Sequence, residues 1–204
     1  MRFHIGAVPE DPSFQPEAEG WSSLDEPGPV AVQWIAIPIA VVVAIFLMAC
    51  FNAAIPRGIY QSKLVILSFQ IWQPFLAIML LVPLHEIIHA FCYPHYGATD
   101  QTLIGVWPQK ILVYAFYQGA MTRARFIITM LTPFLVLSFL PVFSVALFRQ
   151  PPLSGEFLTF LIVASILNGI ASSADILAAA LVFWRLPRQA VIRTKGWKSY
   201  WKKG

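Results

Sequence analysis

Residues 81–92 read LVPLHEIIHAFC, and this stretch decides what kind of protein the chain can be. It is apolar except for His85, Glu86 and His89, and it completes a mostly apolar stretch that begins at residue 64. A stretch of this length, as a helix rising about 1.5 Å per residue, crosses a hydrocarbon layer roughly 30 Å thick. The sequence therefore predicts a membrane helix at residues 64–92 that carries two histidines and a carboxylate.

The composition of the whole chain supports a membrane protein. Of the 204 residues, 58% are hydrophobic and 12% are charged, whereas about 25% of the residues in a soluble domain are charged. Three further apolar stretches, at residues 34–55, 126–148 and 157–184, are also long enough to span. We therefore predict an all-α membrane protein with about four transmembrane helices. Prolines within the spans predict kinks and carbonyl groups that neighbouring helices must satisfy.

The connection between the second and third spans differs from the others. Residues 102–116 are rich in β-branched and aromatic side chains and are interrupted at Pro108, which predicts a short cytoplasmic β-hairpin-like loop. An edge strand at this place could hold an extended peptide by strand addition. The alternative is an interfacial loop anchored by Trp107, Tyr114 and Tyr117.

Lys and Arg residues predict the orientation in the membrane. If both termini are cytoplasmic, eleven basic residues lie inside and three, Arg57, Lys63 and Arg149, lie outside. The opposite orientation reverses this ratio, so the positive-inside rule predicts cytoplasmic N- and C-termini. We expect an integral protein of a bacterial-type plasma membrane.

The spans contain only two acidic side chains, Glu86 and Asp175. Because a carboxylate is costly to place in lipid, it usually faces a partner, a cavity or a metal. His85 and His89 are four residues apart, so a helix presents both rings on one face with Glu86 beside them. This is the zincin pattern H-E-x-x-H, in which the histidines bind zinc and the glutamate is the general base.

A catalytic zinc normally has three protein ligands, and Asp175 is the first candidate for the third. It lies in the fourth span at a depth that matches the depth of His85 within plausible tilt. Asn168 and Ser172 share a helical face with Asp175, at i, i+4 and i+7, and are candidate supporting residues. Asn168 could orient a ligand or a substrate carbonyl.

His95 is the rival for the third ligand. It lies six residues beyond His89, which is the spacing of the extended H-E-x-x-H-x-x-G-x-x-H signature. That signature uses a glycine to reverse the chain, whereas this sequence has Cys92 at that position. The missing glycine therefore favours Asp175 over His95.

With these residues, the chain resembles the site-2 protease superfamily of intramembrane metalloproteases and, more closely, the small membrane proteins grouped as putative zincin peptidases. The resemblance covers residues 64–184. In site-2 proteases an aspartate two helices after the histidine motif is the third ligand, and Asp175 looks like this aspartate. It is followed by Ile176 instead of the usual glycine, and the Asn-x-x-x-Ser-x-x-Asp form is more similar to the zincin peptidases. The resemblance implies zinc as the cofactor.

The two ends of the chain differ in charge. Residues 1–30 carry six acidic side chains among prolines and glycines and predict a disordered acidic tail. Residues 185–204 carry seven of the fourteen Lys and Arg residues and predict a basic cytoplasmic tail that meets anionic lipid, not nucleic acid. Residues 31–184 are then the transmembrane zincin-like domain.

The expected function is that of a zinc-dependent integral-membrane metallopeptidase. It would hydrolyse peptide bonds within the bilayer, and its substrate would be a membrane protein or a peptide. The alternatives are a non-catalytic zinc-binding membrane scaffold and a small ion or proton transporter. Glu86 distinguishes the peptidase from the scaffold, since a structural metal site needs no general base beside it.

Overall fold

The computed structural model describes residues 1–55, 70–148 and 155–204. Its contacts divide the chain into two compact units. Unit 1 consists of Met1–Trp34, Glu86–Thr132 and Ala174–Gly204, and unit 2 consists of Ile35–His85 and Pro133–Ser173. The basic residues Arg57, Lys63 and Arg149, which the orientation count places outside, and residues 64–69 of the expected second span lie outside the described residues.

Within the described ranges, three helical stretches are long and apolar enough to cross a membrane. They are α1 (Pro29–Ala54), α4 (Trp72–Cys92) and the stretch Arg123–Leu147. The third stretch contains α5 (Arg123–Phe134), a π-helical turn (Leu135–Phe139) and most of α6 (Leu140–Phe148). Helices α7 (Gly155–Ala171) and α8 (Ser173–Arg185) are bent by 45° at their junction and add a fourth candidate if they form one broken span.

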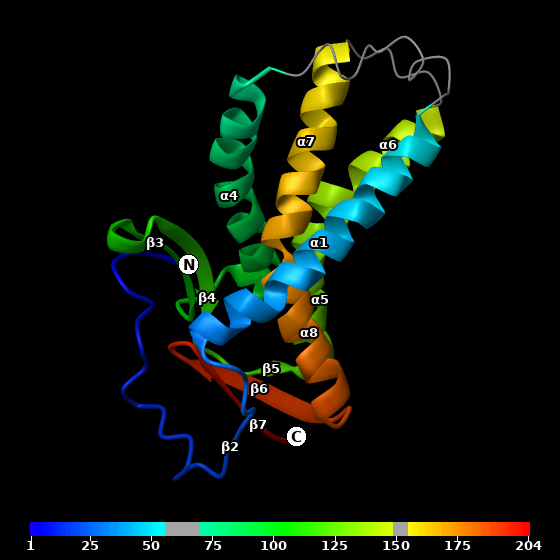
Figure 1. Ribbon diagram of the computed structural model, residues 1–204. Helices are drawn as coiled ribbons and strands as arrows, with labels where there is room; N and C mark the ends of the chain where they lie inside the picture. The colour runs from blue at the N-terminus through cyan, green and yellow to red at the C-terminus, as the bar shows by residue number, and fades with distance from the viewer. Residues whose placement is uncertain (56–69, 149–154) are drawn as a thin grey trace. The chain divides into compact units, whose positions relative to one another are not determined.

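The prediction of an all-α fold is wrong, because unit 1 contains two β-sheets and the protein is therefore mixed α/β (Figure 1). In the first sheet, β1 (Arg2–Ile5) pairs in parallel with β3 (Thr102–Trp107), which pairs antiparallel with β4 (Leu112–Tyr117). The expected hairpin between the second and third spans is formed by β3 and β4, joined by a short 3-10 turn (Pro108–Lys110). The second sheet has the order β2 (Ser22–Ser23), β7 (Lys198–Lys203), β6 (Ala190–Lys195) and β5 (Met121–Thr122).

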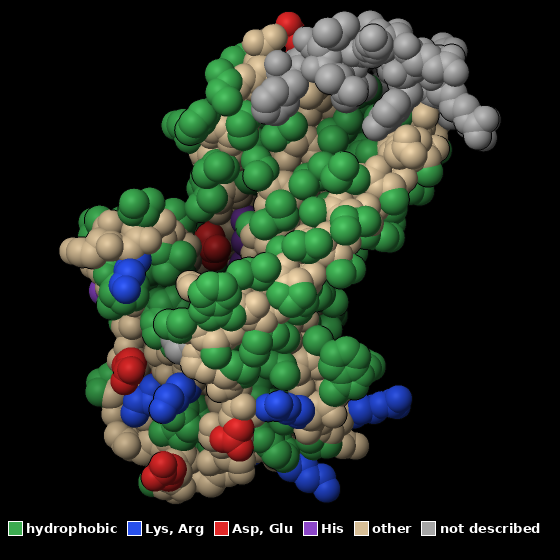
Figure 2. Space-filling model, viewed as in Figure 1, with side chains coloured by type: hydrophobic (Ala, Val, Ile, Leu, Met, Phe, Trp, Pro, Cys, Tyr) green, Lys and Arg blue, Asp and Glu red, His purple; other side chains and the backbone are tan. Residues whose placement is uncertain are grey.

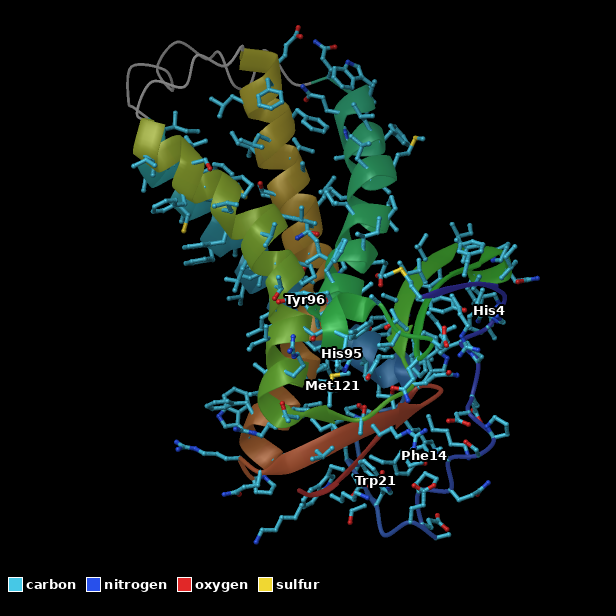
Figure 3. The ribbon with its side chains drawn as sticks, turned by 180° about the vertical axis from the view of Figure 1, so that it is seen from behind. His4, Phe14, Trp21, His95, Tyr96 and Met121 are labelled. Atoms are coloured by element: carbon cyan, nitrogen blue, oxygen red, sulfur yellow. The ribbon has the colours of Figure 1, made fainter. Side chains whose placement is uncertain are left out.

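Both ends of the chain supply strands to these sheets. Residues 1–30, expected to be a disordered tail, contain β1 and β2, and residues 185–204 contain β6 and β7. Phe14 is buried against Trp21 (Figure 3). The Arg193 guanidinium lies 4.1 Å from the centre of the Phe14 ring. Arg193 also pairs with Asp11 at 2.8 Å, and the hydrogen bond from the Ser13 hydroxyl lowers the pKa of Asp11. The N-terminal segment is thus held on the C-terminal sheet.

Two arginines at the start of α5 bind the C-terminal ends of two other helices. Arg125 donates to the carbonyl of Cys92, the last residue of α4, at 3.2 Å. Arg123 donates to the carbonyl of Phe183, in the last turn of α8, at 2.6 Å. Cations are favourable there because the last carbonyls of a helix carry partial negative charge. The start of α5 and the ends of α4 and α8 therefore lie together at one end of unit 1.

Unit 2 is built from apolar helices that approach each other closely. Helix α7 contacts the π-helical turn and α6. A side chain at Gly169 would place its Cβ 2.5 Å from Leu47 and 3.0 Å from Val43, so glycine lets α7 and α1 pack at short range. Among the described residues of this unit, Glu156 is the only charged side chain.

Candidate metal centre

The three side chains that the sequence suggests as metal ligands lie close together in the structure. His85, His89 and Asp175 each offer a ligand atom, and these atoms lie within 4.8 Å of one another. The histidines occupy successive turns of α4, and Asp175 lies in the first turn of α8. His89 Nε2 and Asp175 Oδ2 are 3.5 Å apart. Two atoms that bind one tetrahedral zinc at about 2.0 to 2.1 Å are roughly 3.3 Å apart, so this donor set fits zinc.

Asn168 of α7 fixes the ring of His85. The Nδ1 atom of His85 donates to Asn168 Oδ1 at 2.9 Å. The amide nitrogen of Asn168 donates in turn to Ser138 Oγ at 2.8 Å and to the Pro133 carbonyl at 3.2 Å, which assigns the orientation of the amide. Since Nδ1 carries the proton, Nε2 is the ring atom available to a metal, as is usual for histidine ligands with an outer partner.

The ring of His89 is fixed in the same way by a backbone carbonyl. Its Nδ1 atom donates to the carbonyl of Thr129 in α5 at 2.9 Å. In a regular helix that carbonyl would accept from the residue four positions later, which here is Pro133 and has no N–H. The proline therefore leaves the Thr129 carbonyl unpaired within its own helix, and His89 takes the place of the missing donor.

Glu86 is held by the edge of the first sheet. Its Oε2 atom accepts the backbone N–H of Ala115 in β4 at 2.7 Å. Strand β4 is the outer strand of that sheet, because it pairs with β3 on one side only. The carbonyl of Ala115 accepts a hydrogen bond from the Tyr93 hydroxyl at 3.0 Å. Both outward backbone groups of Ala115 are therefore bound by residues in or just after α4.

A cavity of about 740 Å³ in unit 1 opens beside these groups. Glu86, His89 and Asp175 form part of its wall, together with residues 112–115 of β4. The rest of the lining is mainly apolar. The arrangement combines three side chains that could bind a metal, a neighbouring carboxylate and space for a second molecule.

Two other candidate residues, Ser172 and His95, are not part of the converging group. Ser172 is buried at the junction of α7 and α8, and its hydroxyl has no hydrogen-bond partner in the part of the chain that the structure describes. A supporting role for Ser172 stays a prediction. His95 is exposed in a left-handed turn after α4, with φ 55°, and the converging group does not include it (Figure 3).

Three contributors to the site were not predicted from the sequence. They are the carbonyl of Thr129, the backbone of Ala115 and the hydroxyl of Tyr93. Pro133 offered a signal for the first, since an internal proline frees the carbonyl four residues earlier. Nothing in the sequence identified the other two, because the register of β4 against α4 is set by tertiary packing.

Two histidines one helical turn apart, an aspartate from another helix and a neighbouring glutamate make a site compatible with zinc, of the kind found in metallopeptidases. The family described as “Putative zincin peptidase” matches residues 78–191, which is more than half of the chain, and the chain belongs to this family. Membership suggests a metallopeptidase and implies zinc. No curated protein and no solved structure matches the chain.

Proposed function

We propose that this protein is a zinc-dependent integral-membrane metallopeptidase that hydrolyses peptide bonds. The observation that carries the proposal is the orientation of the two histidine rings. Each ring donates its Nδ1 proton to a fixed acceptor, Asn168 or Thr129, so a metal shared with Asp175 would bind each ring at Nε2. Glu86 follows His85 directly in α4, where a general base is required.

His85, His89 and Asp175 would hold the zinc ion. Bound there, zinc supplies a Lewis acid that polarises a peptide carbonyl and lowers the pKa of water to about 7. Glu86 accepts the proton that the attacking water loses and later donates it to the leaving amine. The hydrogen bond from Ala115 keeps the Glu86 carboxylate pointing into the cavity during both transfers.

The substrate is an extended peptide segment, and strand β4 supports this choice. Outward-facing backbone groups alternate along an antiparallel strand, so Val113 presents its N–H and C=O to the same side as Ala115. Val113 lines the cavity, and no hydrogen bond to its outward groups occurs among the described residues. A peptide that pairs with Val113 by strand addition would lie beside Glu86. The apolar lining favours a hydrophobic segment, such as part of a membrane protein.

The active centre lies near the cytoplasmic end of its span. His89 is three residues before Cys92, or about 4.5 Å along the helix from the end of α4. Arg123 and Arg125 lie at this end, and on the face shown in Figure 2 Lys and Arg side chains gather around the C-terminal sheet. By the positive-inside rule this end is cytoplasmic, as are the N- and C-termini, and the basic residues there bind anionic lipid.

A site-2-protease-like mechanism is the finer form of this proposal. The histidine motif on one span and an aspartate on a later helix support it. The bend between α7 and α8 places Asp175 in the first turn of a helix that begins inside the candidate span. A break of this kind supports a polar site at membrane depth, where non-helical backbone is tolerated only beside protein or a cavity.

Metal analysis combined with a peptidase assay tests the proposal. Purified wild type in detergent is expected to contain about one zinc per chain, and His85→Ala and Asp175→Ala should each lose it. Glu86→Gln should keep the zinc and abolish hydrolysis of a pool of apolar, internally quenched peptides. A wild type that takes up no zinc at micromolar concentrations refutes the metallopeptidase. If Glu86→Gln cleaves as fast as wild type, the role of the base is wrong.

A further inference from the structure

Tyr93 lies immediately after the metal-binding end of α4 and has no assigned role in the proposed chemistry. It follows His89 by four residues and His85 by eight, so it continues the face that carries both rings. Its side chain is 4% exposed and forms part of the cavity wall with Glu86 and Asp175. A tyrosine at this place can contact the Glu86 carboxylate directly, or it can contact the backbone group that binds this carboxylate.

The contacts of Tyr93 point to the second possibility. Its hydroxyl donates to the Ala115 carbonyl at 3.0 Å, and the N–H of the same Ala115 donates to Glu86 Oε2 at 2.7 Å. One residue of the edge strand is therefore bound at both of its outward groups. The two bonds reach it from positions seven residues apart, about 10 Å along the α4 direction.

Two hydrogen bonds restrict movement of β4 next to the base. Besides its ladder with β3, the strand is joined at Ala115 to Glu86 of α4 and to Tyr93 just after α4. Two attachments at one residue limit tilting of the strand about either bond. A carboxylate held by a fixed N–H keeps one geometry, and preorganised geometry is what a catalytic base needs.

The environment of Tyr93 keeps its hydroxyl group protonated, so that the group can donate a hydrogen bond. Burial, with the nearby charges of Glu86 and Asp175, raises the pKa of Tyr93 far above its ordinary value. The ring stacks on Tyr117 with centroids 5.3 Å apart, so its position does not depend on the hydroxyl alone. Removing the hydroxyl should therefore leave the ring in place.

We propose that Tyr93 is a positioning residue, which fixes Ala115 of the edge strand and through it the carboxylate of Glu86. The inference rests on the proposed function for its kinetic consequence. The mechanical part, that Tyr93 holds strand β4 at Ala115, is independent of catalysis and can be measured by itself.

Tyr93→Phe tests both parts, with Tyr117→Phe as the matched control. The Tyr117 hydroxyl also makes a 3.0 Å hydrogen bond, to Gln101, and its ring is the other half of the stacked pair. Among the described residues, the hydrogen bond of the Tyr117 hydroxyl goes to Gln101 and not to Ala115. The readouts are zinc content, kcat and KM on the apolar quenched peptides, and amide hydrogen exchange of the β4 peptide by mass spectrometry.

Tyr93→Phe should lower kcat by about tenfold or more, as losses of outer partners at metal sites do. KM and zinc content should stay near the wild-type values. Exchange at Ala115 should be at least about fivefold faster, as for a lost hydrogen bond. Tyr117→Phe should change neither kcat nor the exchange at Ala115.

Two results would overturn the proposal. One is an equal loss of kcat in Tyr93→Phe and Tyr117→Phe, and the other is an unchanged exchange rate at Ala115 in Tyr93→Phe. In either case the Tyr93 hydroxyl is only one of several packing contacts. A wild type that cleaves none of the peptides counts against the proposed function. In that event the exchange rate at Ala115 still decides whether Tyr93 holds the strand.

Discussion

Replacing Asn168 with leucine tests the outer part of the metal site. The substitution preserves the approximate size of a side chain that is 2% exposed and removes three hydrogen bonds. These join it to His85 Nδ1 at 2.9 Å, to Ser138 Oγ at 2.8 Å and to the Pro133 carbonyl at 3.2 Å. The ring of His85 then loses the hydrogen bond from its Nδ1 atom to Asn168, which fixes its orientation and tautomer in the wild type.

The lost contacts have two separate effects, one on zinc binding and one on the stability of the fold. Loss of an outer partner weakens metal binding by about 10- to 100-fold, which is about 1.4 to 2.8 kcal/mol of binding free energy. Separately, each buried polar group that loses its partner costs about 1 to 3 kcal/mol of stability. The variant should therefore unfold at a lower temperature in the absence of zinc and also bind zinc more weakly.

Competition with a chromophoric zinc chelator in detergent at pH 7 measures the Kd, and thermal unfolding of the zinc-free protein measures the stability term. Ser165→Ala is the matched control, because Ser165 is also buried on α7 and, in the part of the chain that the structure describes, its hydroxyl bonds only to Leu161 of the same helix at 2.7 Å. Its Kd should equal that of wild type within about twofold. An Asn168→Leu protein that binds zinc as tightly as Ser165→Ala would refute the role of Asn168.

Two further predictions concern stability. Gly97→Ala should lower the unfolding temperature more than Gly20→Ala, although both glycines have φ 72°, because only at position 97 would the new Cβ lie 2.3 Å from a backbone oxygen, that of Ala90. The excess should be about 1 to 3 kcal/mol, read by thermal unfolding, and equal losses would contradict it. Burial raises the pKa of Glu26, whose carboxylate accepts the Ser199 N–H. This carboxyl therefore stabilises the fold below its unfolded pKa and loses that contribution as the pH rises through the folded pKa. Glu26→Gln should unfold at a higher temperature than wild type at pH 7 and at the same temperature near about pH 4; a constant difference across this range would exclude the carboxyl.

The sequence predicted the convergence of His85, His89 and Asp175 because local rules determine most of it. Helical spacing fixes the two histidines, and the low charge of the spans leaves few candidates for a third ligand. The rings of His85 and His89 lie as those rules require. The acceptor of the His89 proton could have been predicted as well, since Pro133 leaves the Thr129 carbonyl without a helical donor.

The hairpin of β3 and β4 was predicted, and the other strands were missed for two different reasons. Strands β6 and β7 had a readable signal, because Gly196, with φ 56°, begins a two-residue turn between Lys195 and Lys198, and such turns join hairpins. We did not predict this hairpin, because the many basic residues of this segment led us to interpret it as a lipid-binding tail. Strand β1 had no local signal, since four residues pair with β3 about a hundred positions later, and only the partner defines the register.

The number and preparation of the ligands favour catalysis over a structural metal. Structural zinc sites usually have four protein ligands, and in small metal-dependent domains the metal itself organises them. In the described part of this chain the converging group has three members, and hydrogen bonds to Asn168 and Thr129 orient its histidines. Three prearranged ligands leave a tetrahedral ion one open position. That position would lie near the cavity that Glu86 lines, where a water molecule and a peptide could meet the base.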